Sequence, residues 1–385
     1  MGVYLAVLAV IFACIWITRR YPGQKTNRLC AFFCCFLLVL VAGFRYRVGT
    51  DALLYQDLFE IYPKIGDLSA KYVFESRWAP LFVVWFSFCH TLFDSFIVYQ
   101  FIYAAILTFA IYLTLLNNTK MLLYVLALYF VYAFPYFTFD LCREGLAMSI
   151  FLYGFYFLQK KKIIVYFVFA ALAYLTHPSS VFVFFVPLLT RIKLTKKNTI
   201  ITFVAFLLGS IVAFKLVVWA LTVLPTTNIT YVALRYLKRY NETEGLSVMR
   251  LVYCTVVFYM AVYKNLGKAR DAREQLCFNI AFVSILIMCL EKAIPYIFRL
   301  NTYFILFFFI AICSYVEREV FIKKHALLKF VLVLLICCSV KVLDYAKNKT
   351  TYNAYIPYVS VFDPHRIPDR EWHGKWQFFY YDQRL

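Results

Sequence analysis

A succession of apolar runs separated by short basic loops constrains this chain more than any other feature. A helix of about 20 apolar residues crosses the hydrocarbon core of a bilayer, which is about 30 Å thick. Hydrophobic residues make up 64% of the 385 residues, well above the 45–50% typical of soluble domains. Because only helices and closed barrels satisfy their backbone polar groups in lipid, the sequence predicts an all-α polytopic membrane protein. The runs cover 3–18, 29–44, 78–93, 95–115, 121–138, 144–158, 163–176, 179–190, 199–222, 248–264, 275–290, 299–316 and 327–343.

The basic loops indicate the orientation of these runs. They share one side of the membrane if a single run between 45 and 115 fails to cross, and the positive-inside rule makes that side cytoplasmic. The run 78–93 is short and contains Pro80 and His90, so we expect it to be re-entrant or interfacial. About twelve crossings with both termini outside follow. The loops concerned carry Arg19, Arg20, Lys25 and Arg28; Lys160–Lys162; Arg191, Lys193, Lys196 and Lys197; Lys264, Lys268, Arg270 and Arg273; and Arg318, Lys323 and Lys324.

The pattern predicts one transmembrane domain over 1–345 and a polar, aromatic outer tail over 346–385. The longest outer loops are 45–77 and 223–247. The run 3–18 lacks a basic n-region and a cleavage site, which favours a retained helix. The net charge of +20 does not indicate nucleic-acid binding, because the positive residues are spread over short loops.

Three ionisable residues lie at one end of a predicted helical hairpin. Arg143 and Glu144 open an apolar helix that three lysines close, and the returning helix ends at His177. Charged groups at membrane depth are costly, which makes this end a site hypothesis. The planar fork of Arg143 suits a phosphate or pyrophosphate. The alternative is an internal Arg143–Glu144 ion pair that fixes two helices.

His177 is predicted to lie below the outer surface. The run 163–176 spans about 21 Å as a helix, less than the hydrocarbon core. A histidine recessed in a cavity there could act as a general base near neutral pH. The alternative is a buried structural histidine that bonds a neighbouring helix.

The first outer loop supplies a second group of candidates. Arg45 and Arg47 end the second apolar run, and Thr50 or Asp51 can cap the helix that follows. Asp51 and Tyr55 are four residues apart and would share a face of that helix. An interfacial cap with snorkelling arginines is the alternative. Further candidates for binding pyrophosphate or glycan are Arg77, Arg250, Glu291 and Arg299, and Arg235, Lys238 and Arg239 add charge to the loop 223–247.

Motifs for nucleotide or metal chemistry are absent from the sequence. It contains no Walker A motif, GxGxxG, HExxH or GxSxG. Nothing in it requires a metal or a cofactor, and we expect none.

Five segments in order resemble one family. FRYRVGTDALLY, REGLAMSIF with its KKK end, ALAYLTHPSSVF, RLNTYF and YIPY look like the EpsG group of Wzy-type polysaccharide polymerases, over about residues 40–360. Glu144 departs from the family pattern, in which Gln often follows this Arg. The resemblance implies a GT-C-like, multi-spanning glycosyltransferase of the bacterial inner membrane, with its active site facing outside.

The resemblance also implies the reaction and its partners. Such enzymes join oligosaccharide repeat units carried on undecaprenyl pyrophosphate, and a chain-length regulator protein is a possible partner. Arg143 and Arg299 would hold the donor pyrophosphate, supported by Arg45, Arg47 and Arg250. His177 would deprotonate the acceptor hydroxyl, with Asp51 as the other candidate base. One-step displacement would be inverting. Alternatives are a lipid-linked oligosaccharide flippase, which needs a repeat that the sequence lacks, and another polyprenyl-linked glycosyltransferase or ligase.

Overall fold

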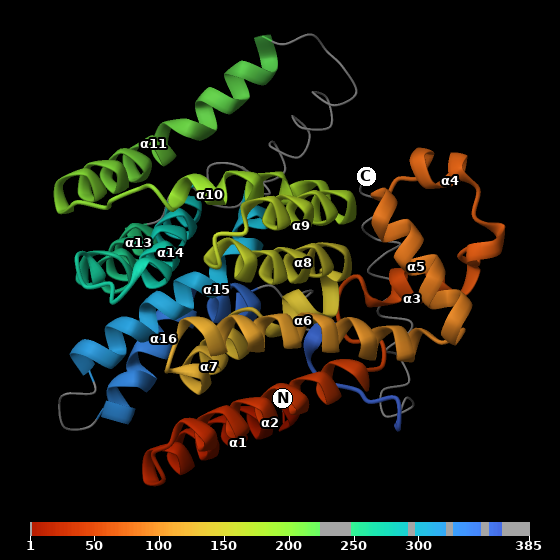
Figure 1. The fold of residues 1–385 in the computed structure, drawn as a ribbon, viewed down its shortest axis with the longest axis horizontal. Coiled ribbons are helices and arrows are strands. Elements are labelled where there is room, and N and C mark those ends of the chain that lie inside the picture. Colours follow the sequence, from red (N-terminus) through yellow and green to blue (C-terminus); the bar gives the residue numbers. More distant parts are fainter. Residues whose placement is uncertain (1, 224–247, 292–296, 321–325, 348–353, 364–385) are drawn as a thin grey trace. The chain divides into compact units, whose positions relative to one another are not determined.

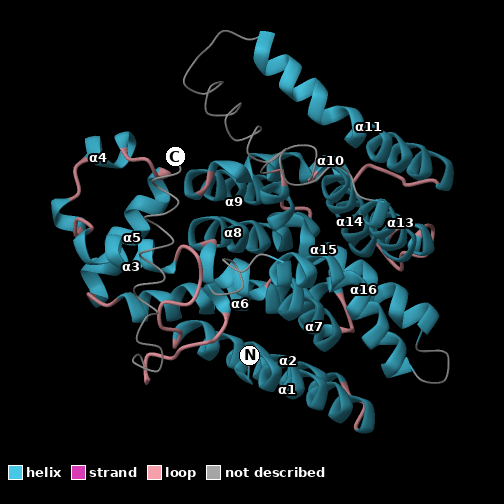
Figure 2. Ribbon diagram, turned by 180° about the vertical axis from the view of Figure 1, so that it is seen from behind, coloured by secondary structure: helices cyan, strands magenta, loops and turns pink. Residues whose placement is uncertain are grey.

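The computed structural model describes residues 2–223, 248–291, 297–320, 326–347 and 354–363. These residues are almost entirely helical (Figures 1 and 2). Within these ranges no strand forms, and the single β-bridge pairs Arg45 with Ser360.

The helices divide into two compact units. The first unit comprises 1–184 with 341–385, and the second comprises 185–340. In the first unit the elements are α1 (Gly2–Arg20), α2 (Gln24–Gly43), α3 (Ala52–Ile61), η1 (Ile65–Asp67), α4 (Ala70–Glu75), α5 (Pro80–Phe93), α6 (Phe96–Asn118), α7 (Leu122–Tyr132), η2 (Tyr136–Asp140), α8 (Cys142–Gln159), α9 (Ile163–Thr176) and most of η3 (Pro178–Phe185). In the second they are α10 (Val186–Leu189), α11 (Lys196–Val223), α13 (Val248–Ala261), η4 (Tyr263–Asn265), α14 (Ala272–Leu290), α15 (Phe298–Tyr315), η5 (Val316–Val320) and most of α16 (Ala326–Lys347).

Several helices have the length and composition needed to cross a membrane. Among the described residues five meet both requirements: α1, α2, α6, α14, and a span from Phe298 to Glu319 that contains α15. Shorter apolar helices accompany them, including α9 and α5. The protein is therefore a multi-pass membrane protein, while the count of twelve crossings stays a prediction. The run 179–190 coincides with most of the 3-10 helix η3 and with the short α-helix α10, so it is helical but not one continuous α-helix.

The predicted central hairpin forms from α8 and α9, which pack side by side (Figure 1). On its other side α8 packs against α6. The approach of α8 to α6 is close at Gly145, where a Cβ would collide with the Tyr103 hydroxyl. That hydroxyl donates to the carbonyl oxygens of Phe137 (2.7 Å) and Leu141 (3.2 Å). The first turn of α8, which carries Arg143, is thus held against α6.

The predicted first outer loop, residues 45–77, folds as α3, η1 and α4 before α5 begins. Buried aromatic rings join these elements to the unit: Phe59 of α3 packs against Phe86 of α5 and Tyr99 of α6, with ring centroids 5.1 and 5.5 Å apart. The His90 ring contacts the Tyr62 carbonyl oxygen at 2.7 Å through Nδ1 and the Asp94 carboxylate at 3.0 Å through Nε2. The buried His90 thus ties α5 to the end of α3.

The segment 354–363 packs along the start of the same loop. Backbone hydrogen bonds join Tyr46 N–H to Val359 O and Gly49 N–H to Ala354 O, each at 2.9 Å. The Tyr358 hydroxyl donates to the carbonyl oxygen of Val41 at 2.8 Å. This part of the predicted outer tail therefore belongs to the packing that shapes residues 44–51.

Candidate functional site

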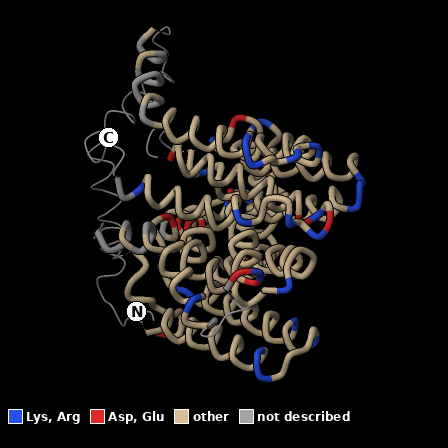
Figure 3. The backbone as a smooth tube through the Cα atoms, turned by 90° about the vertical axis from the view of Figure 1, so that its left-hand side faces the viewer, with Lys and Arg blue, Asp and Glu red and all other residues tan. Residues whose placement is uncertain are grey.

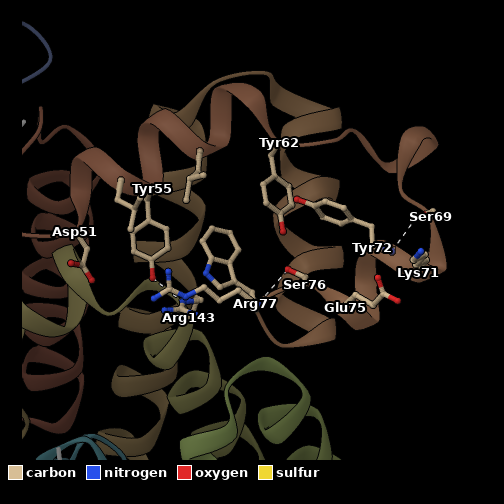
Figure 4. A pocket seen from close by; sticks show the side chains of 13 residues that line it. Asp51, Tyr55, Tyr62, Ser69, Lys71, Tyr72, Glu75, Ser76, Arg77 and Arg143 are labelled. Atoms are coloured by element: carbon tan, nitrogen blue, oxygen red, sulfur yellow. Dashed lines mark hydrogen bonds between the residues drawn. The ribbon is translucent and has the colours of Figure 1, made fainter. Parts of the chain in front are cut away.

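A pocket of about 690 Å³ opens between the predicted first outer loop and the start of α8 (Figure 4). Three cationic and two acidic side chains share it with four aromatic rings. Its walls are Asp51, Leu54, Tyr55, Leu58, Tyr62, Ser69, Lys71, Tyr72, Glu75, Ser76, Arg77, Trp78 and Arg143. Four predicted site residues, Asp51, Tyr55, Arg77 and Arg143, are brought together here although 92 positions separate the first from the last.

Arg143 is held in place by two aromatic residues. Its Nε donates to the Tyr55 hydroxyl at 3.1 Å, and its guanidinium carbon lies 5.3 Å from the centroid of the Trp78 ring. No described residue accepts a hydrogen bond from its Nη1 or Nη2. No ion pair forms between Arg143 and Glu144, so the predicted alternative of such a pair is not what positions Arg143. The guanidinium presents its terminal N–H groups to an anion while Tyr55 and Trp78 fix its plane.

The aromatic rings of the pocket form a connected wall. Tyr62 and Trp78 stack with centroids 5.5 Å apart, and Tyr62 meets Tyr72 edge-on at 5.9 Å. Figure 4 shows Tyr55 and Arg143 at one end of the pocket, with Lys71, Tyr72 and Glu75 at the other. Tyr and Trp present an apolar face and a polar group together. The pocket therefore suits a ligand with an anionic part and a hydroxyl-rich part.

Asp51 reaches the pocket because the backbone before α3 is held by Asp140. Asp51 is the N-cap residue of α3, but its side chain makes no capping hydrogen bond, unlike the predicted cap. Instead Oδ1 of Asp140 accepts the N–H of Thr50 at 2.6 Å and that of Asp51 at 3.4 Å. Gly49 has φ +124°, and a Cβ there would meet Oδ1 of Asp140 at 2.5 Å. Only glycine fits this backbone turn without strain.

Asp140 itself is buried, and a third group, the Tyr355 hydroxyl, contacts its carboxylate in addition to the two backbone N–H groups. The Tyr355 hydroxyl donates to its Oδ2. Asp140 lies in the connection between α7 and α8, outside the candidate spans. Burial raises the pKa of the Asp140 carboxyl to about 7, the charge of Asp51 acts in the same direction, and the hydrogen bonds from Tyr355 and Thr50 oppose both. This carboxyl therefore changes its protonation near neutral pH.

The raised pKa of Asp140 predicts a pH-dependent stability that Asp140→Asn removes. The folded protein holds a proton that the unfolded chain loses above about pH 4, so stability falls as the pH rises towards 7, by up to about 1.4 kcal/mol per pH unit. The substituted asparagine would still accept from Thr50 and could donate to Tyr355. We expect apparent unfolding temperatures in detergent from pH 5 to 8 to fall less in the Asn variant. Asp57→Asn, at an exposed position of α3, is the control, and parallel curves for wild type and Asp140→Asn would contradict the expectation.

His177 lies at the end of α9 and outside the pocket lining. Its Nδ1 and the Ser179 Oγ are 2.7 Å apart, and the Ser179 hydroxyl also lies within donating distance, 3.4 Å, of Oε1 of the buried Glu144. The Ser179 hydroxyl thus links the His177 ring to the Glu144 carboxylate by hydrogen bonds. Both residues stand at the same end of the α8–α9 hairpin as Arg143, as the sequence predicted.

The two arginines of the RYR segment lie outside the pocket lining. Arg45 is 1% exposed, and its guanidinium donates to the carbonyl oxygens of Ala42 (2.5 Å) and Phe139 (3.4 Å). Arg47 is half-buried, with its guanidinium carbon 5.6 Å from the ring centroid of Tyr46. These contacts fix Arg45 to the backbone of α2 and of η2. A pyrophosphate-binding role for Arg45 or Arg47 stays a prediction.

The remaining candidates belong to the second unit. Arg250 donates to Oε2 of Glu291 at 2.6 Å, and Asn301 donates to Oε1 of the same carboxylate at 3.4 Å. Arg299 lies in the first turn of α15 and is half-buried. Their roles as ligands stay predictions. Arg235, Lys238 and Arg239, and the predicted loop 223–247 apart from its first residue, lie outside the described residues.

Sequence reasoning missed several residues that build the pocket. Trp78, Lys71 and Glu75 line it, but their loop carries no periodic signal that separates a pocket wall from an exposed surface. Asp140 offered a usable signal, because it is an acidic residue between two long apolar runs and three positions before Arg143.

The described helices define an all-helical, multi-pass membrane protein, and the pocket between residues 51–78 and Arg143, which combines cations, carboxylates and aromatic rings, defines its candidate site. The chain belongs to the EpsG family, whose sequence model matches residues 28–360. This confirms the resemblance seen in the sequence and implies a glycosyltransferase-like role in making polysaccharide. No curated protein and no solved structure matches the chain.

Proposed function

We propose that the protein polymerises oligosaccharide repeat units carried on undecaprenyl pyrophosphate, at the outer face of the bacterial inner membrane. The growing glycan is transferred from its lipid pyrophosphate to a sugar hydroxyl of a new lipid-linked unit. The observation that carries the proposal is the pocket in which Arg143, with its terminal N–H groups unengaged by described residues, shares a cavity with Asp51 and four aromatic rings. Membership of the EpsG family supports it.

The donor pyrophosphate would lie at the Arg143 end of the pocket. Arg77 also lines the pocket and adds a second guanidinium. A guanidinium binds two phosphate oxygens at once, and its charge stabilises the pyrophosphate as it leaves with the electron pair of the broken C1–O bond. Tyr55 and Trp78 already fix the orientation of Arg143, which lowers the cost of ordering it when substrate binds.

The acceptor hydroxyl needs a base as its oxygen forms the new bond to C1. Asp51 lines the same pocket as Arg143, so its carboxylate is the better placed of the two predicted bases to take the proton. His177 remains the alternative, with Ser179 as a bridge towards Glu144. Attack from the face opposite the leaving pyrophosphate would invert the anomeric centre.

The pattern of lipid-linked products tests this function against the flippase alternative. In a bacterium that lacks the protein, a missing polymerase leaves single repeat units on undecaprenyl pyrophosphate outside the inner membrane, whereas a missing flippase leaves them inside. We expect gels of extracted glycolipids to show single units accessible to a glycosidase added to spheroplasts. Protected single units would contradict the proposal, and normal polymer would exclude both roles.

The predicted orientation is testable by cysteine labelling. Gly66 and Lys120 are both exposed, in the first outer loop and between α6 and α7. Gly66→Cys should react with an impermeant maleimide added to intact spheroplasts, and Lys120→Cys should react only after lysis. Background should be low because the native cysteines are buried, apart from the half-buried Cys30. The reverse pattern at the two sites would overturn the topology.

A further inference from the structure

A second cavity of about 490 Å³ lies at the opposite end of α8 from Arg143. It is formed where α2 begins and where α6 and α8 end. Both polar and apolar side chains line this cavity. Its lining consists of Arg28, Ala110, Leu113, Thr114, Leu116, Asn117, Asn118, Leu152, Tyr153, Phe155, Tyr156, Phe157 and Gln159.

Hydrogen bonds fix the amide groups of this second cavity. Gln159 Nε2 donates to Asn118 Oδ1 at 2.5 Å, and Asn118 Nδ2 donates to Thr114 O at 2.8 Å. Asn117 Nδ2 donates to Leu113 O at 2.7 Å. Because an amide nitrogen carries two hydrogens, these bonds orient Asn117 and Gln159 and leave each of them a second N–H for a ligand.

The three chain links that contribute residues to this cavity are basic and contain no acidic residue. The three links 19–28, 117–121 and 159–162 contain eight Lys and Arg residues and no Asp or Glu. Figure 3 shows Lys and Arg concentrated at the ends of helices and at the turns between them. The Lys160 ammonium rests over the Tyr156 ring, with Nζ 5.6 Å from the centroid.

Three basic side chains of the second unit, Lys268, Arg270 and Arg318, form ion pairs with carboxylates of the chain. Arg270 bonds Glu274 at 3.1 Å and Glu317 at 3.2 Å, Lys268 bonds Glu319 at 2.8 Å, and Arg318 bonds Glu274 at 2.8 Å. Carboxylates of the chain neutralise these cations. Arg28, by contrast, has no acidic residue in its own link or in the two links beside it. The positive charge at the second cavity is therefore available to an anion from outside the chain.

We propose that the second cavity binds the phosphate group of an anionic membrane lipid, with Arg28 as its main cationic ligand. Basic pockets between transmembrane helices hold lipid headgroups in this way. A lipid is favoured over a soluble phosphate because apolar surface continues from the site. Leu29, Phe32 and Phe36 of α2 are each at least half exposed, and Phe32 lies one turn beyond Arg28. An acyl chain would cover this face while the phosphate contacts Arg28, Asn117 and Gln159.

Lipid-dependent thermal unfolding of the purified full-length protein tests the site. A ligand that binds only the folded state raises the unfolding temperature by an amount that grows with the ratio of its concentration to its dissociation constant. We expect phosphatidylglycerol added to detergent-solubilised protein to raise it at concentrations where phosphatidylcholine does not. Because a charge-assisted hydrogen bond to the phosphate is lost, Arg28→Gln should need at least about tenfold more phosphatidylglycerol for the same shift. Asn117→Asp, which places a negative charge in the exposed part of the lining, should weaken the response similarly.

Controls separate the site from general attraction and from soluble phosphate. Lys193→Gln removes an exposed cation from another basic loop and should leave the response unchanged. The proposal would be overturned if Lys193→Gln weakened the response to phosphatidylglycerol as much as Arg28→Gln does. It would also be overturned if Arg28→Gln and Asn117→Asp both responded like the wild type. An equal shift with glycerol 3-phosphate or inorganic phosphate would overturn the lipid assignment. The readout is binding, so the result does not depend on the proposed polymerase activity.

Discussion

Arg143→Lys is expected to remove nearly all polymer while the amount of folded protein stays normal. Lysine keeps the charge but loses the planar fork, its hydrogen bond to Tyr55 and its fit over Trp78. Loss of one preoriented group that stabilises the transition state costs about 10²–10³-fold in turnover. The measurements are polymer length on gels, turnover of purified enzyme with lipid-linked repeat units, and the unfolding temperature.

Two other arginines provide matched comparisons. Arg191→Lys changes an exposed arginine of a predicted cytoplasmic loop and should leave turnover within a few-fold of wild type. Arg45→Lys should reduce polymer less than Arg143→Lys does. It should also lower the unfolding temperature, because the buried guanidinium of Arg45 bonds two backbone carbonyl oxygens in the wild type. Full-length polymer from Arg143→Ala would show that the donor site is misplaced.

Asp51→Asn is expected to lower turnover about 10²–10⁴-fold, the usual contribution of a general base. Asparagine keeps the size and hydrogen bonding of the side chain but cannot accept the proton. The Asp140 contacts go to the backbone N–H groups of Thr50 and Asp51, so α3 should keep its place. Donor binding, measured with a lipid pyrophosphate that carries no transferable glycan, should change little.

His177→Gln is the paired test for the other candidate base. Glutamine can keep a contact with Ser179 and removes the titratable ring. We expect a smaller loss than in Asp51→Asn, since His177 is outside the pocket lining. A loss of about 10²-fold or more in His177→Gln with near-normal turnover in Asp51→Asn would assign the base to His177. The pH–rate profile, measured in an Asp140→Asn background to remove the carboxyl that also titrates near neutrality, gives an independent answer, because a limb near neutrality then indicates histidine and one well below it indicates a carboxylate.

Much of the first unit was predictable from local pattern. The apolar runs predicted α1, α2, α6 and the α8–α9 hairpin. Arg143 and the three lysines lie at the two ends of α8, as the sequence predicted. The run 179–190 is helical, as predicted, but hydropathy did not indicate that its first part is a 3-10 helix. The pairing of segment 354–361 with residues 44–49 was also missed, because no local signal links residues that lie so far apart along the chain.

Apolar runs and basic loops were enough to identify a helical membrane protein, and five ordered segments were enough to indicate its family. The free energy of placing a segment in lipid depends on that segment's own composition, so it can be read without knowing its neighbours. Only the tertiary structure showed that Arg143 shares one pocket with Asp51 and Trp78, whereas the Arg45 guanidinium bonds backbone carbonyl oxygens instead. Those outcomes depend on contacts between distant segments, such as Gly145 against Tyr103 and Asp140 against Thr50 and Tyr355, which no single segment specifies.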